Sequence, residues 1–281
     1  MLKTTIDYKL SRRIFSATTI RTFKTLFARL SPQDCALCGS SAPHVICAPC
    51  EAGLPRSIGP SCTRCAAPLA EHSLYASEAG ECGVCLAELP YFDHTITAFR
   101  YDFPVDRLIQ AYKFRANLVF TGMFADAIAA RVLENAGAAI DANANTDAVE
   151  QLSRSGQLAY PLPDLIMPTP LAAKRLAERG FNQSALLGRA VALRLKIKFL
   201  ADGLQRVRET RPQSGLKREE RLKNVHGAFA CAAHVEGKRI AIVDDVMTTG
   251  ATFSEAAKAL KNAGAIYVGA WACARAAQPH Q

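Results

Sequence analysis

The 281-residue chain has 49% hydrophobic and 21% charged residues, the composition of a globular soluble protein, and it is long enough for one large domain or for a domain with a smaller module. It contains no apolar run near the roughly 20 residues that span a bilayer, and its N-terminus lacks the apolar core and cleavage site of a signal peptide. We therefore expect no stable membrane insertion and a cytoplasmic location, and the formal charge of +9 favours an anionic partner.

The first predicted segment, residues 1–33, is rich in Lys and Arg and poor in acids. Within it the stretch IRTFKTLFARL has the apolar spacing of an amphipathic helix. Such a helix either contacts a nucleic acid or a membrane surface, or it is a frayed terminus or packs on the neighbouring module. The residues leave this choice open.

A cysteine-rich module is predicted over residues 34–90, where eight of the ten cysteines form four CxxC pairs. A CxxC turn places two sulfurs on one side of a zinc tetrahedron, so four turns predict two structural zinc sites. Without an export signal, metal binding in a reducing compartment is favoured over disulfides. Consecutive pairing is preferred, although interleaved pairing stays open, and it gives the two sets Cys35, Cys38, Cys47, Cys50 and Cys62, Cys65, Cys82, Cys85.

The predicted zinc sites affect the net charge of the chain and leave two functions open for the cysteine-rich module. Each four-thiolate site with zinc carries about −2, which lowers the effective charge of the chain to about +5. The module either folds as a structural unit only, or it also binds a nucleic acid or a protein.

Residues 91–281 are predicted to form an α/β domain. HTITAFRYDF predicts a strand that turns back on itself, and PVDRLIQAYKF predicts a helix with Pro104 at its start. A second helix is expected near residues 118–133. Residues 135–160 are rich in Ala and Asn without a clear apolar face, so they are interpreted as a surface insertion.

The following elements alternate between strand and helix. DLIMPTP predicts a short buried strand, LAAKRLAERG a helix that ends at Gly180, and FNQSALLGRAVALRLKIK a further helix. The stretch QRVRETRPQSGLKREERLKN is basic and polar and has little to bury.

The C-terminal part repeats this alternation. KRIAIVDDV is a continuous apolar run bounded by charge, as expected for a strand covered on both faces. TFSEAAKALKNAG predicts a helix that stops at Gly264, and IYVGAWACAR predicts the last strand. Together these segments predict a parallel sheet flanked by helices, of the doubly wound type.

A candidate phosphate loop lies between the last two of these strands, directly before the helix. It consists of Thr248, Thr249, Gly250, Ala251 and Thr252. Backbone N–H groups at a helix start have no intrahelical partners, and the helix dipole adds partial positive charge there. Gly250 permits close approach of an anion, and Thr252 with Glu255 predicts a capping box. Both the GxxxxGK[ST] and the GxGxxG patterns are absent.

Two acids, Asp244 and Asp245, precede this loop. Carboxylates accept hydrogen bonds from a vicinal diol and are good ligands of Mg²⁺. A ligand with a 5-phosphate and ribose hydroxyls satisfies both halves, and phosphoribosyl pyrophosphate with Mg²⁺ fits that description. The alternative is an ordinary strand-to-helix turn with solvated acids.

The stretch VDDVMTTGAT resembles the signature of type I phosphoribosyltransferases, and the chain from Cys35 to Arg275 is similar to the ComF family, also described as GntX-like. Further matching stretches are YKFRAN, PTPLAAKRLAERGFNQS and RETRPQSGLKREERLKNVHGAF. This resemblance implies a double zinc ribbon followed by a type I phosphoribosyltransferase-like sheet. It also implies binding of phosphoribosyl pyrophosphate and of single-stranded DNA.

The resemblance assigns roles to individual residues. Asp244 and Asp245 would hold the ribose hydroxyls and, through them, Mg²⁺, while the loop Thr248–Thr252 would hold the 5-phosphate. Candidates for the pyrophosphate are Lys113, Arg175 and Arg179. The basic stretch of residues 206–223 would act as a mobile lid, with Arg208, Arg211 and Gln213 contacting the leaving group.

Two functions of different classes follow. The first is a Mg²⁺-dependent phosphoribosyltransferase that acts by displacement at ribose C1 on an unidentified acceptor. The second is a non-catalytic protein of natural competence and DNA uptake that handles single-stranded DNA and contacts a helicase. Few aromatic residues outside the expected core are free to stack on bases, which weighs against sequence-tolerant stacking.

Overall fold

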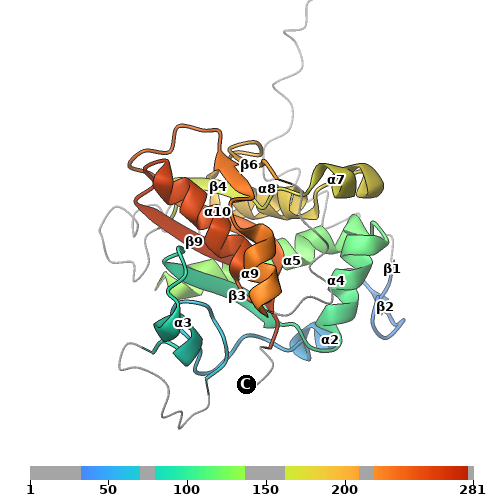
Figure 1. Ribbon diagram of the computed structural model, residues 1–281. Coiled ribbons are helices and arrows are strands. Elements are labelled where there is room, and N and C mark those ends of the chain that lie inside the picture. Colours follow the sequence, from blue (N-terminus) through green and yellow to red (C-terminus); the bar gives the residue numbers. More distant parts are fainter. Residues whose placement is uncertain (1–32, 70–79, 137–161, 209–217, 278–281) are drawn as a thin grey trace, which may run out of the picture. The chain divides into compact units, whose positions relative to one another are not determined.

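A computed structural model describes residues 33–69, 80–136, 162–208 and 218–277 (Figure 1). The chain divides into two compact units, residues 1–53 and 54–281. The expected N-terminal helix, nearly all of the 135–160 insertion and the middle of the expected lid lie outside the described residues. The predicted domain bounds, 1–33, 34–90 and 91–281, stay predictions.

The described part of the first unit is built around one small hairpin and one short helix. Strands β1 (Gln33–Asp34) and β2 (Ser41–Ala42) pair antiparallel, and α2 (Ala48–Ala52) follows. One CxxC turn lies between the two strands, and Cys47, the first cysteine of the next pair, caps the N-terminus of α2. Both pairs are therefore held by tight local turns.

The second unit is organised on a five-stranded sheet with the order β3-β9-β8-β4-β5, in which every pairing is parallel. The strands are β3 (His94–Arg100), β9 (Tyr267–Arg275), β8 (Arg239–Met247), β4 (Leu165–Pro168) and β5 (Lys198–Phe199). The apolar run of β8 lies at the centre of the sheet and is buried through Val243. This sheet confirms the predicted α/β fold class.

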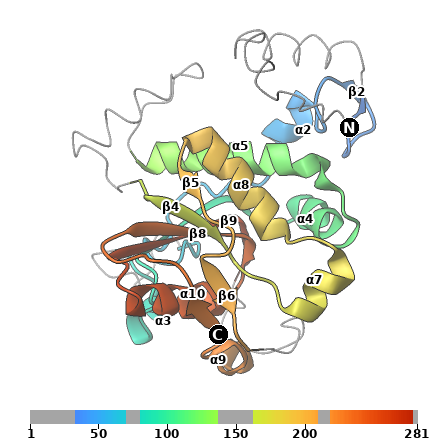
Figure 2. The ribbon, with the colours of Figure 1, turned by 90° about the horizontal axis from the view of Figure 1, so that it is seen from above.

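Helices cover both faces of this sheet (Figure 2). On one face α5 (Thr121–Asn135) packs with α8 (Gln183–Leu195), and on the other face lies α10 (Ala251–Asn262). The approach of α8 to the sheet is close at Gly188, where a Cβ atom would lie 3.1 Å from Phe199 Cε2 and 3.5 Å from Val243 Cβ. A side chain at this position would force α8 away from the sheet.

Several predicted helix boundaries are confirmed. Helix α4 (Val105–Phe114) has Pro104 as its N-cap. A short 3₁₀ turn, η1 (Leu118–Phe120), precedes α5, and α7 (Ala173–Arg179) ends at Gly180 with a φ of 75°. Only glycine adopts this left-handed conformation without strain, which explains why the helix stops there.

The prediction that HTITAFRYDF turns back on itself is wrong. Strand β3 runs straight and pairs in parallel with β9 from His94 to Arg100. Its residues from His94 to Phe99 are buried, so the segment is stabilised as an extended strand by its neighbour rather than by a hairpin. The chain bends only after Arg100, ahead of α4.

The second unit also contains smaller elements outside the main sheet. Helix α3 (Gly83–Ala87) carries Cys85, and β6 (Leu204–Arg206) pairs antiparallel with β7 (Phe229–Cys231). Helix α9 (Arg218–Val225) forms within the basic stretch that was expected to have little to bury, and of its described side chains Val225 is buried. Among the described helices, none has the length and apolar character to cross a membrane.

Candidate functional site

A cavity of about 690 Å³ lies at the carboxyl edge of the parallel sheet. Its wall includes Tyr101 after β3, Thr169 after β4, and Thr248 after β8. Ligands of open α/β sheets bind at this edge because loops and helix N-termini converge there. The predicted site residues that line the cavity are Lys113, Arg175, Arg179, Asp244, Asp245, Thr248, Gly250, Ala251 and Thr252.

Asp245 is the more deeply buried of the two acids at the end of β8, with 3% of its surface exposed. Its Oδ1 atom forms a 2.8 Å ion pair with Lys113 Nζ from α4. Its Oδ2 atom is buried and makes no hydrogen bond within the described part of the chain. Burying a carboxylate oxygen without a hydrogen bond is costly, so Oδ2 is suited to accept from a donor or to bind a cation.

Asp244 is half-buried and faces the cavity. Its Oδ1 atom accepts hydrogen bonds from Ser184 Oγ at 2.6 Å and from the Asp245 backbone N–H at 2.8 Å. Burial and the neighbouring Asp245 charge raise the pKa of Asp244 to about 7, although Lys113 and Ser184 act in the opposite direction. Its carboxyl group therefore takes up or loses a proton near neutral pH.

The Lys113 ammonium stays charged in this setting. Burial alone would lower its pKa, but the carboxylates of Asp245 and Asp244 outweigh that effect and raise the pKa above the usual value. About a fifth of its side chain is exposed. Lys113 thus lines the cavity, and its ammonium interacts electrostatically with both Asp245 and Asp244.

The loop before α10 differs in one detail from the expected capping box. Helix α10 begins at Ala251 rather than after Thr252, and its N-cap is Gly250 with a φ of 81°. Glu255 accepts a 2.8 Å hydrogen bond from the Gly227 backbone N–H instead of capping the helix. The capping-box prediction is wrong because the left-handed glycine, not a side chain, sets the turn. The first N–H groups of α10 have no partner within the helix, and Gly250, Ala251 and Thr252 line the cavity.

The cationic wall of the cavity comes from two elements. Arg175 and Arg179 lie on α7, and Arg206 lies at the end of β6. Burial lowers the pKa of the Arg179 and Arg206 guanidinium groups below the usual value, although such groups stay charged at neutral pH. Sequence reasoning missed Arg206, which is the first residue of the basic stretch.

The remaining predicted residues are less central. Thr249 lies in the loop, and its Oγ1 atom accepts from the Ala251 N–H at 3.4 Å. Arg208 is exposed, and its guanidinium donates to the backbone carbonyls of Asn224, at 3.0 Å, and His226. Arg211 and Gln213 lie outside the described residues.

Three aromatic side chains are exposed among the described residues: Tyr91, Phe103 and Phe114. Phe114 lines the cavity with 70% of its surface exposed, and the Arg179 guanidinium carbon lies 4.9 Å from its ring centroid. Phe103 is 78% exposed. Exposed aromatic side chains are few among the described residues, as expected, but the end of α4 places one of them, Phe114, at the cavity rather than in the core.

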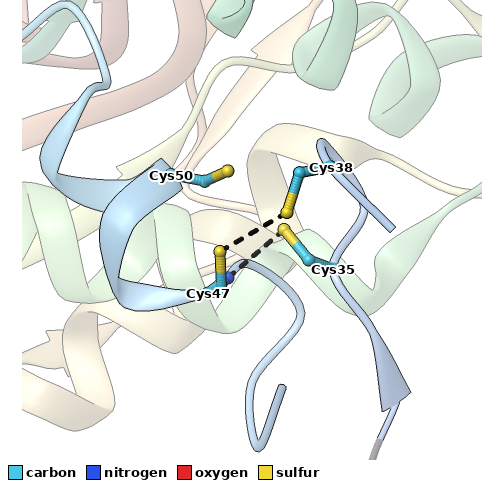
Figure 3. Close-up of side chains that lie close together, drawn as sticks. All are labelled: Cys35, Cys38, Cys47 and Cys50. Atoms are coloured by element: carbon cyan, nitrogen blue, oxygen red, sulfur yellow. Dashed lines mark hydrogen bonds between the residues drawn. The ribbon is translucent and has the colours of Figure 1, made fainter. Parts of the chain in front are cut away.

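The eight CxxC cysteines form two clusters, grouped as consecutive pairing predicted: Cys35, Cys38, Cys47, Cys50 and Cys62, Cys65, Cys82, Cys85. Within each cluster one ligand atom from every cysteine lies within 4.8 Å of the others. Figure 3 shows the sulfurs of the first cluster directed toward one another, with a Cys38–Cys47 separation of 3.6 Å and a bond from the Cys47 N–H to Cys35 Sγ.

These dimensions fit zinc. Four sulfurs bound tetrahedrally at about 2.3 Å from a zinc ion lie about 3.8 Å from one another. The Cys38–Cys47 distance is 3.6 Å and the Cys65–Cys82 distance is 3.7 Å. In the second cluster the backbone N–H groups of Cys65 and Cys82 also point at Cys62 Sγ, at 3.5 and 3.3 Å. The clusters are zinc-ribbon-like sites.

Two further residues escaped sequence reasoning. Ser184 is the last residue of the matching stretch PTPLAAKRLAERGFNQS and donates to Asp244, so its place in that stretch was an available signal. Arg275 is a charged residue at the end of a strand that is otherwise apolar, and it is 2% exposed. A charge in such a run could have been flagged as a residue with a specific partner.

Comparisons with known proteins agree with this architecture. A double zinc ribbon domain model matches residues 26–86, and a phosphoribosyl transferase domain model matches residues 182–280. The chain is 33% identical over 220 residues to "Competence protein F" of Haemophilus influenzae, covering 77% of this chain and 85% of that protein. It is 31% identical over 230 residues to "DNA utilization protein YhgH" of Salmonella typhi, covering 82% and 90%.

A solved structure described as that of the allosteric regulatory enzyme of purine biosynthesis is a more distant match. It is 21% identical, covers 43% of this chain and 23% of that chain, and has a TM-score of 0.28, which is too low to support an argument.

Proposed function

Because this chain belongs to the ComF family, together with competence protein F and YhgH, we propose that its cavity binds phosphoribosyl pyrophosphate with Mg²⁺. The observation that carries the proposal is the juxtaposition of an acid pair and a glycine-led helix start in one cavity with a cationic wall. A phosphate and a sugar diol are the two chemical groups that such neighbours recognise together.

The 5-phosphate would lie against the loop Thr248–Thr252, where backbone N–H groups and the α10 dipole favour an anion. Gly250 keeps this approach open, because it has no side chain and adopts a left-handed conformation. The half-buried Asp244 would accept hydrogen bonds from the ribose hydroxyls. The Asp244 carboxyl group has to lose its proton before its oxygens can accept hydrogen bonds from both ribose hydroxyls. Ligand binding is therefore expected to favour the ionised form of Asp244.

The pyrophosphate would be held by Arg175, Arg179 and Arg206, with Lys113 close by. Arg208, Arg211 and Gln213 remain proposed lid residues. Mg²⁺, when bound with the ligand, would neutralise part of the pyrophosphate charge. The Oδ2 atom of Asp245, which has no hydrogen-bond partner among the described residues, and the Asp244 carboxylate are oxygen ligands of the kind that Mg²⁺ prefers.

Transfer to an acceptor would be a displacement at ribose C1. The C1–O bond breaks and its electron pair leaves with pyrophosphate, while an acceptor lone pair forms the new bond and the acceptor proton passes to solvent. The residues of the cavity would position the two reactants and stabilise the negative charge of the leaving group. The acceptor is unidentified.

Each cysteine cluster would hold one structural zinc ion through its four thiolates. A full set of protein ligands leaves no open coordination position, so these sites would stabilise the fold rather than take part in chemistry. Metal analysis of the protein purified under reducing conditions is expected to give about two zinc ions per chain. Absence of zinc would overturn this assignment.

Calorimetry with phosphoribosyl pyrophosphate and Mg²⁺ tests the ligand. The wild type is expected to bind, and Asp244→Asn or Arg175→Ala should weaken binding by about tenfold or more, since each removes a charged contact. Glu134→Gln, which changes an exposed acid on α5, is the control. No binding by the wild type, or equal binding by Asp244→Asn, would refute the assignment. Release of pyrophosphate with nucleobases, ammonia or single-stranded DNA then tests transfer.

A second candidate function is the handling of single-stranded DNA in competence, with a helicase as partner and the cytoplasm as location. The names of the two relatives favour it, as do the +9 charge and the exposed Phe114 beside Arg179. Aromatic rings next to arginines are suited to stacking of unpaired bases.

Fluorescence anisotropy with a labelled oligonucleotide at several salt concentrations tests this second function. Affinity is expected to fall steeply with salt, because cationic residues release counterions from phosphate. Phe114→Ala should weaken binding at every salt concentration, by about 1–3 kcal/mol if one base stacks on the ring. Leu193→Ala, at another exposed apolar residue, is the control. A flat salt response would contradict the proposal.

A further inference from the structure

Arg275 connects the second cysteine cluster to the phosphate loop. It is the last residue of β9 and is 2% exposed. Its Nε atom donates to the Cys65 carbonyl at 2.8 Å. Its Nη1 atom donates to the carbonyls of Met247, at 3.1 Å, Thr248, and Ala276, at 2.8 Å. One planar group is thus bonded at the same time to the Cys65 carbonyl in the second cluster and to the carbonyls of Met247 and Thr248, where strand β8 ends and the loop begins.

The charge of this guanidinium has no carboxylate partner among the described residues, and its Nη2 atom is buried without a hydrogen bond there. A buried cation is costly unless an opposite charge lies close by. Four thiolates around a zinc ion carry a net charge of about −2. The second cluster with zinc bound, whose Cys65 carbonyl accepts from Arg275, would therefore supply the negative charge that balances the guanidinium.

A second set of contacts, made by Tyr91 and Phe92, also connects the second cysteine cluster to the phosphate loop and α10. Phe92, which follows the cluster along the chain, is 1% exposed, and its ring would lie 3.5 Å from a Cβ atom placed on Gly250. The Tyr91 N–H donates to Ser254 Oγ in the first turn of α10 at 3.1 Å. Cys62, Cys65 and Cys85 belong to the same hydrophobic core as Phe92. The loop therefore lies against Phe92, which shares a hydrophobic core with three cysteines of the cluster, and Arg275 links the loop to the cluster by hydrogen bonds.

We propose that Arg275 is a positioning residue through which zinc in the second cluster sets the geometry of the phosphate loop. With the cluster loaded, the guanidinium is fixed by charge, and it holds the Met247 and Thr248 carbonyls away from the anion so that the loop N–H groups face it. Without zinc the tether loses its counter-charge and the loop is released. The prediction for the ligand rests on the proposed binding of phosphoribosyl pyrophosphate, whereas the prediction for the loop does not.

Hydrogen–deuterium exchange of the full-length protein tests the coupling without any ligand. Partial removal of zinc by a chelator, or Cys65→Ser, should speed exchange of the amides of residues 247–252. Cys38→Ser in the first cluster, which belongs to the other compact unit, is the matched control and should leave them unchanged. Unchanged exchange at the loop after loss of the second zinc would overturn the proposal, whether or not the ligand binds.

Zinc release from the wild type supplies a second test that needs no variant. Coupling between the equilibrium affinities of two sites is reciprocal. Phosphoribosyl pyrophosphate with Mg²⁺ should therefore raise the affinity of one of the two sites for zinc by about fivefold or more, as measured by competition with a chromogenic chelator. Equal release with and without a ligand that calorimetry shows to be bound would refute the coupling. A ligand that does not bind, together with a loop that still responds to zinc, would refute the proposed ligand alone.

Variants of Arg275 separate positioning from general stability. Arg275→Gln should weaken ligand binding and increase loop exchange, and Arg275→Lys should restore part of both, since it keeps the charge but loses the planar set of donors. The control is Arg64→Gln, which breaks a 3.0 Å ion pair with Glu81 beside the same cluster. If Arg64→Gln and Arg275→Gln have equal effects on the loop, Arg275 has no positioning role.

Discussion

Replacing Lys113 with Met should destabilise the protein by an amount that depends on pH. The Lys113–Asp245 ion pair has a 2.8 Å separation, which corresponds to a gross attraction of about 6 kcal/mol at an effective dielectric constant of about 20. Desolvation of both groups offsets much of this. Removing one partner of a buried pair costs about 3–5 kcal/mol, and the partial exposure of Lys113 reduces the expected loss to about 2–4 kcal/mol at pH 8.

The pH dependence follows from Asp244. Its pKa in the folded protein is raised to about 7 from an ordinary value of 3.8, so its ionised form opposes folding, and this penalty grows as the pH rises between these two values. Lys113 lowers the pKa of Asp244, so its removal raises that pKa further and enlarges the penalty at high pH. The destabilisation should therefore be largest above pH 7 and smaller at pH 5.5.

Urea unfolding in zinc-containing buffer measures this effect, with the fluorescence of the single tryptophan, the buried Trp271, as the signal. The double variant Lys113→Met/Asp245→Asn should recover much of the loss, because it leaves no uncompensated charge. Lys174→Met, at an exposed position of α7, is the control. A loss for Lys113→Met that is equal at both pH values, or a double variant as unstable as the single one, would refute the electrostatic reasoning.

Three further outcomes are expected. Binding of phosphoribosyl pyrophosphate with Mg²⁺ should strengthen as the pH rises through about 7. Ser184→Ala should move this midpoint to higher pH, because the Ser184 hydrogen bond lowers the pKa of Asp244. Calorimetry at a series of pH values measures both, and affinity that does not change with pH, or a midpoint that does not move, would contradict them. Gly250→Ala and the control Gly237→Ala should each cost about 1–2 kcal/mol in urea unfolding, since both adopt a positive φ, but only the former should weaken ligand binding. Removal of both zinc ions should lower the unfolding midpoint, and an unchanged midpoint would contradict a structural role for zinc.

The sequence predicted those features that depend on residues close together in the chain: a buried strand, the cysteine turns and two helix ends. The run KRIAIVDDV was recognisable as a fully buried strand because its apolar residues are continuous, and the structure has it as the central strand β8. The CxxC turns indicated two four-cysteine sites, since each turn constrains two sulfurs by itself, and the structure has the consecutive grouping that was preferred over the interleaved one. The start of α4 at Pro104 and the end of α7 at Gly180 follow from the backbone preferences of those two residues.

Features that depend on the tertiary arrangement could not be predicted in the same way. The ion pair between Lys113 and Asp245 joins α4 to β8, and no local pattern connects these segments. The straight course of β3 depends on pairing with β9, which lies near the other end of the sequence. Glu255 was expected to cap its own helix, but the left-handed Gly250 made that cap unnecessary and left Glu255 to bind Gly227.

The strand order has a consequence for how the chain is made. Strand β9, the last of the described strands to be synthesised, lies between β3 and β8, so β3 lacks its partner in the main sheet until β9 has been translated. Pairing between segments so distant in sequence is slow, and the waiting strand edge is prone to aggregation. The tether at Arg275 forms in that same final step, so a nascent chain can acquire both cysteine clusters well before its phosphate loop is fixed.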